Sequence, residues 1–172
     1  MAFVNQIQPV NFFDQKIKAL RVICQERVNE SGDLVLPFIN TVVDPELVEV
    51  TITEVGMPVI TNLEALRGKV VNVGFVPVTL TITVGGIIDL VDITVNVPFQ
   101  GVIECPGVLP GDNIQKHDIQ VLGVIDTVVT VATIVNAVFA ESTALNLKVV
   151  VELCVVISRE EVLKVNASNL FC

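Results

Sequence analysis

The residues best suited to chemistry gather in the stretch DNIQKHD (112–118), which brings Asp112, His117 and Asp118 close together in the sequence. Carboxylates and an imidazole are ligands for transition metals, so these residue types could form a metal site. His117 is the chain's single histidine, and the residues around it are polar and turn-forming. We therefore interpret the stretch as a solvated turn and expect neither a metal nor a cofactor.

Sequence signatures of catalysis are absent. The chain contains no GxGxxG, P-loop, HExxH, GxSxG or EF-hand pattern. It has no Trp and no Tyr, and a cysteine nucleophile would have His117 as its only candidate base. The glycines at 85, 86, 107 and 111 read as turn glycines, because no helix start follows them to bind a phosphate. The sequence thus predicts a protein that is not an enzyme and has no catalytic residue.

The four cysteines, Cys24, Cys105, Cys154 and Cys172, form no CxxC pair and match no zinc-site spacing. Cys24 and Cys154 lie in apolar strand patterns, which favours small core residues. Cys105 precedes a Pro-Gly pair at a strand end and Cys172 stands last, so we expect both to be exposed and able to cross-link neighbouring molecules. All four remain candidates for intermolecular cross-links, and their connectivity stays open.

Composition favours an all-β protein that binds neither nucleic acid nor membranes. Hydrophobic residues make up 52% of the chain, and β-branched Val, Ile and Thr account for 64 of 172 residues. The net charge of −9 would repel a phosphate backbone. The apolar, charge-free run 127–140 is shorter than the roughly 20 residues of a membrane-spanning helix. The first residues lack the basic and apolar regions of a secretory signal, so we expect synthesis and retention in the cytosol or release by lysis.

Turn signals recur between short β-branched segments, which is typical of a sandwich or barrel rather than a βαβ fold. We expect an antiparallel β-sandwich of the jelly-roll or Greek-key type with about 8–10 strands. The predicted organisation is an irregular N-terminal arm over 1–16, the sandwich domain over 17–165 and a C-terminal tail over 166–172. The predicted core comprises Val50, Ile52, Val71, Val73, Leu80, Ile82, Ile93, Val95, Ile103, Val121, Val149, Val151 and Val155.

Local signals divide the chain further. Residues 29–33 (NESGD) predict a turn, 69–75 and 77–84 predict two separate strands, and 159–165 could form a helical turn. Segments such as VVTVATIV and VVVELCVVI are apolar on both strand faces, so part of their surface must be covered by another layer or another subunit. We favour association between subunits over a thicker intramolecular core.

The predicted arm contains five apolar side chains in a segment too irregular for a core strand. They are Phe3, Val4, Ile7, Phe12 and Phe13. Fully buried, each would contribute roughly 1.5–3 kcal/mol, so the arm is a candidate for anchoring one subunit on another.

The stretch from about Val50 to Glu161 resembles the SPOCS-type domain family of coat and morphogenetic proteins of bacterial endospores. The resemblance is carried by GKVVNVG (68–74), by VPF (97–99) with Ile103-Glu104 and Pro106-Gly107, and by the long closing segment TALNLKVVVELCVVISREEVLKV. These motifs cover about two-thirds of the chain.

This resemblance implies a non-catalytic protein made in the mother-cell cytoplasm and deposited on the endospore surface. We expect it to self-assemble into a coat layer, an exosporium layer or an appendage fibre, with itself and other spore coat proteins as partners. The alternative is a protein-binding module that recruits other coat proteins. The first hypothesis predicts homopolymers, whereas the second predicts a soluble monomer with a discrete heterologous patch.

Overall fold

Alternation of side chains along the strands builds two antiparallel sheets that face each other. The structure is a computed structural model that describes residues 12–37, 45–135 and 138–168. Its strands are β1 (Phe12–Pro37), β2 (Val48–Val55), β3 (Val59–Leu66), β4 (Lys69–Val84), β5 (Ile87–Glu104), β6 (Asn113–Val135) and β7 (Val138–Ser168), with one 3-10 turn η1 (Pro45–Leu47). The predicted all-β, antiparallel, sandwich-like fold is confirmed.

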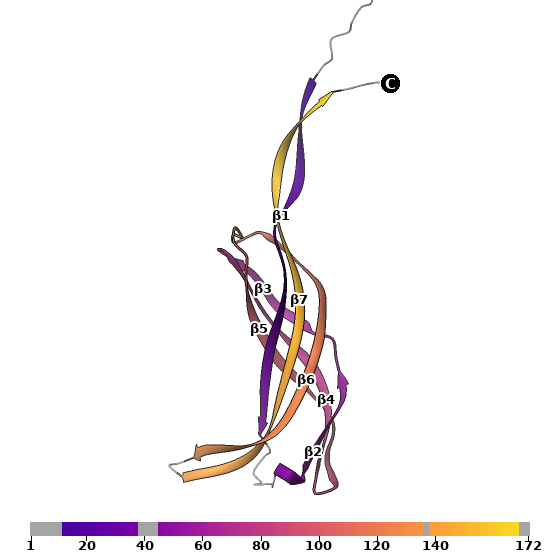
Figure 1. Ribbon diagram of the computed structural model, residues 1–172, viewed down its shortest axis with the longest axis vertical. Helices are drawn as coiled ribbons and strands as arrows, with labels where there is room; N and C mark the ends of the chain where they lie inside the picture. Colours follow the sequence, from indigo (N-terminus) through magenta and orange to yellow (C-terminus); the bar gives the residue numbers. More distant parts are fainter. Residues whose placement is uncertain (1–11, 38–44, 136–137, 169–172) are drawn as a thin grey trace, which may run out of the picture.

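The first sheet has the order β1-β7-β6, so the chain's first and last described strands are neighbours (Figure 1). In the second sheet, β4 pairs with β2, β3 and β5. Because β5 pairs with β4 from one end to the other, β2 and β3 lie end to end along the opposite edge of β4. Each sheet is therefore three strands wide.

The core lies between the sheets and follows the pleat of β4, whose even-numbered residues from Val70 to Ile82 are buried. One buried cluster joins β4 and β5 to β7. It consists of Val76, Val78, Leu80, Ile82, Val97, Phe99, Leu145, Leu147, Val149 and Val151. A second cluster, nearer the Cys105 end, includes Val70, Ile103, Leu153, Val155 and Ile157.

Most of the predicted core residues lie in or against these clusters, but Val71 and Val73 do not. They are half-buried on the opposite face of β4, and the inner face at this level carries Val70, Asn72 and Gly74. Gly74 belongs inside because a β-carbon there would overlap the ring of Phe99. Since adjacent residues of a strand point to opposite faces, this contact determines the face of the whole segment.

Three of the local predictions are wrong, and two of them would each have divided one strand into two; the described residues contain seven strands rather than 8–10. Residues 29–33 continue β1, because they pair with β7 between Glu152 and Lys148. Pro77 lies inside β4, where its carbonyl accepts a 2.8 Å bond from Gly56 N between β2 and β3. Residues 159–165 extend β7 and pair with β1 instead of forming a helical turn.

The boundaries of the predicted arm and tail also shift. Phe12 and Phe13 belong to β1, where they pair with Ser168 and Ala167 of β7. Residues 12–16 and 166–168 are therefore strand residues. Phe3, Val4, Ile7 and Cys172 lie outside the described residues.

Candidate functional site

The residues first considered for chemistry, Asp112, His117 and Asp118, do not converge. The Asp112 carboxylate accepts two 2.7 Å bonds from Nε and a terminal nitrogen of Arg159, and a 2.9 Å bond from Leu109 N. The bonds from Arg159 hold the pKa of Asp112 below its ordinary value. His117 and Asp118 are exposed on β6. Within the described residues no group of three or more His, Cys, Asp or Glu could hold a metal ion.

Arg159 also donates a 3.1 Å hydrogen bond to the carbonyl of Gly107, in the loop between β5 and β6. Asp112 and Arg159 thus close the loop between β5 and β6 onto β7. The sequence reading missed the pairing because the two residues are 47 positions apart. Their role is structural, since both charges are used in the contact.

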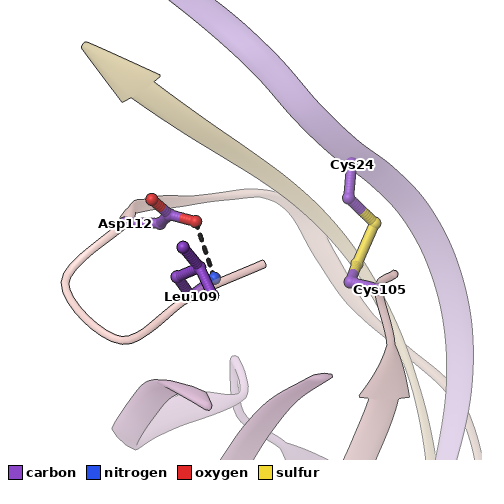
Figure 2. Close-up of a disulfide and its surroundings, with 4 residues drawn as sticks. All are labelled: Cys24, Cys105, Leu109 and Asp112. Carbon is purple, nitrogen blue, oxygen red and sulfur yellow. Dashed lines mark hydrogen bonds between the residues drawn. A yellow bond between two sulfur atoms is a disulfide. The ribbon is translucent and has the colours of Figure 1, made fainter. Parts of the chain in front are cut away.

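A disulfide joins Cys24 of β1 to Cys105 at the end of β5 (Figure 2). Their Cα atoms lie 5.8 Å apart, and the bond closes a sequence separation of 81 residues that contains all of the second sheet. Cys105 is fully buried, so its predicted exposure is wrong. The reason is that Cys105 N donates to Gly68 O at 2.9 Å, which draws the strand end inward.

The disulfide changes the set of candidate cross-links. Cys24 and Cys105 bond to each other within one chain, so neither is available to a neighbouring molecule in this state. Cys154 is unpaired and buried, as the sequence predicted for a core cysteine. Cys172, the remaining candidate, lies outside the described residues.

A buried polar contact links the sheets a short distance along β1 from the disulfide. Asn72 Nδ2 of β4 donates to Glu30 Oε1 of β1, and both side chains are buried. The Glu30 side chain fills the space above Gly101 of β5, where any β-carbon would overlap its carboxyl group. Glu30 Oε2 and Asn72 Oδ1 have no hydrogen-bond partner in the described residues.

Burial raises the pKa of Glu30, and the bond from Asn72 offsets part of that rise. Burial favours the neutral form because a charged carboxylate loses its hydration when it is removed from water. The sequence offered no signal for this contact, because NESGD reads as a turn in which a carboxylate would face water.

Beyond the sandwich, β1 and β7 continue as a two-stranded ribbon, which we define as residues 12–22 paired with 158–168. The third strand of the sheet stops at this level, because β6 begins at Asn113 opposite Ser158. Figure 1 shows the ribbon standing away from the body along the long axis. It is crossed by ion pairs of Lys18 with Glu160 and of Arg21 with Glu161.

The ribbon exposes apolar side chains on both of its faces. The exposed side chains are Ile17, Leu20, Val22, Val162 and Leu163. Ile17 and Leu163 are cross-strand partners on one face, whereas Leu20, Val22 and Val162 share the other. A two-stranded ribbon is marginally stable in water by itself, so these side chains mark a surface that gains from being covered.

A cleft of about 600 Å³ opens on the body where the two sheets part. The junction of β2 and β3 forms one wall with Val55, Met57 and Pro58, and β6 forms the other with Ile119, Leu122 and Val124. Met57 is 78% exposed, so the rim is apolar as well as the floor. Both walls are edge strands of their sheets within the described residues.

Comparisons of the chain with protein-family models, with curated proteins and with solved structures found no match. In the described part of the chain, no helix has the length and apolar character needed to cross a membrane.

Proposed function

We propose that this protein is a non-catalytic structural component of the bacterial endospore surface that self-assembles into a coat layer, an exosporium layer or an appendage fibre. The observation that carries the self-assembly is the projecting β1–β7 ribbon, whose apolar side chains are exposed on both faces. Nothing within the described part of the same chain covers them. A second molecule is the simplest cover for such a surface.

The assignment to the spore surface depends on the resemblance of residues 50–161 to the SPOCS-type family. The disulfide is compatible with a protein that ends up outside the reducing cytosol, because such bonds persist in oxidising surroundings. Synthesis in the mother-cell cytoplasm followed by deposition on the spore would supply that change of environment.

Size-exclusion chromatography and negative-stain imaging of the purified full-length protein test the proposal. We expect ordered assemblies whose amount grows with protein concentration. A monomer at every concentration would refute self-assembly and favour the recruiting module. Antibody labelling of spores tests the location separately, and label confined to vegetative cells would refute it.

A further inference from the structure

The ribbon and the cleft both expose apolar side chains that the described part of the chain leaves uncovered, and they lie on different parts of the molecule. Each combines exposed apolar side chains with strand edges that have no partner in the described residues. Unpaired strand edges are templates for another strand. The inference below rests on the proposed self-assembly and names the two surfaces that would meet.

The ribbon and the strands that border the cleft carry complementary charges, although the residues that line the cleft itself are uncharged. The ribbon carries five of the chain's ten basic residues and three acidic residues, although the chain as a whole has a net charge of −9. Arg159 is one of the five and is held by Asp112, so the ribbon keeps four other basic residues against three acidic ones. Strands β2, β3 and β6, which border the cleft, carry five acidic residues and one basic residue. The acidic residues are Glu49, Glu54, Glu64, Asp118 and Asp126, all exposed. A ribbon is thus attracted to the cleft, whereas two ribbons of net positive charge repel each other.

The ribbon and the cleft also both present apolar side chains to solvent. One ribbon face presents Leu20, Val22 and Val162, which are 56%, 56% and 60% exposed. The cleft offers the apolar walls around Met57 and Leu122 to receive them. Burial of these side chains supplies affinity, and the surrounding charges supply orientation.

A ribbon cannot enter the cleft of its own chain. Strand β7 runs without a break from Val162 in the ribbon to Glu152, which pairs with Gln120 in the cleft wall. Ten residues of strand span about 33 Å, and the ribbon points away from the body along the same strand (Figure 1). The two surfaces are therefore held apart within one molecule.

From these observations we propose that the β1–β7 ribbon of one copy docks in the cleft between β2–β3 and β6 of a second copy. Such a contact joins two different surfaces, so each added copy leaves one ribbon and one cleft available. A heterologous contact of this kind propagates into fibres or lattices unless its rotation closes a ring.

Two sets of substitutions on the full-length protein test the docking. The ribbon variant Leu20→Thr/Val22→Thr/Val162→Thr removes apolar surface and places β-branched threonine, a residue that favours strands, at all three positions. The cleft variant Met57→Lys/Leu122→Lys places positive charge where a basic ribbon would lie. The control, Val102→Lys, changes a 55% exposed apolar residue outside both surfaces. All six positions are exposed, and circular dichroism and thermal melting verify that each variant folds.

We expect each of the two variants to weaken association at least tenfold in sedimentation velocity experiments, whereas the control assembles like wild type. A mixture of ribbon and cleft variants should form dimers that grow no further, because each dimer keeps only its two defective surfaces. Folded variants that assemble like wild type would overturn the docking and leave the proposed function standing. Wild type that stays monomeric would overturn the proposed function itself.

Discussion

Removal of the Cys24–Cys105 disulfide tests how the second sheet is held to the first. The bond closes a separation of 81 residues, from β1 to the end of β5, and this loop contains β2, β3 and β4. In the chain-entropy treatment, a cross-link over a loop of that length stabilises the folded state by about 4.5 kcal/mol, because it restricts the unfolded chain. The double variant Cys24→Ala/Cys105→Ala should lose most of this free energy of unfolding.

The thermal effect of that loss is large enough to measure. For a chain of this size, each kcal/mol changes the midpoint temperature by roughly 2–4 °C, so we expect a decrease of about 9–18 °C. Unfolding of wild type followed by circular dichroism with and without reductant should show the same decrease. The double variant should not respond to reductant.

A matched control is Cys154→Ala, which removes the buried unpaired cysteine and keeps the disulfide. This variant should lose some packing energy but retain the full response to reductant. The reasoning is refuted if reductant changes the unfolding free energy of wild type by less than about 1 kcal/mol, since the entropy of the 81-residue loop would then be missing.

The remaining predictions concern the ionisation of Glu30, the exposed histidine of β6 and the two termini. Burial raises the pKa of Glu30, so the folded protein favours the protonated side chain. The stability that the protonated form contributes is fully present below the ordinary pKa of 4.5 and is lost as the pH rises through the raised value. The variant Glu30→Gln should remove this pH dependence. Denaturant midpoints measured from pH 4 to 8 check this, and parallel profiles of wild type and variant would contradict it. His117→Ala should leave stability within about 0.5 kcal/mol and assembly unchanged, because the side chain is exposed; loss of a turnover activity in that variant would contradict the non-catalytic assignment. Deletion of residues 1–13, which removes the candidate arm side chains and the first two residues of β1, should give a folded protein defective in assembly. Cys172→Ser should lower the denaturant resistance of assemblies without abolishing the fold. Imaging and non-reducing electrophoresis test both, and normal assemblies from the truncated chain or an unshifted monomer band from oxidised wild type would refute them.

The all-β class could be predicted from the sequence because it follows from local properties. Val, Ile and Thr prefer extended backbone, and strict alternation, as in the segment that forms β2, indicates a strand with one face toward a core. The turn at Gly85-Gly86 was likewise predictable, since both glycines adopt positive φ angles that other residues avoid. These features depend on a few adjacent residues.

The lengths of the strands, and which side of each strand faces the core, could not be predicted without the tertiary contacts. NESGD reads as a turn, yet it continues β1 because Glu30 reaches Asn72 and because Gly32 lets the strand approach the backbone at Pro98. Val71 and Val73 alternate as well as Val70 does, and the Gly74–Phe99 contact decides which set faces the core. Local propensity differs little between such alternatives, so packing between distant strands selects one.

The candidate site depended even more on long-range geometry. Cys24 with Cys105, Asp112 with Arg159 and Glu30 with Asn72 are 81, 47 and 42 residues apart, and no spacing rule connects them. The sequence by itself determined that the chain forms strands rich in apolar residues. Only the tertiary structure decided which of those residues remain uncovered, because exposure depends on where the neighbouring strands end: β6 begins opposite Ser158, and β1 and β7 continue beyond it as a pair.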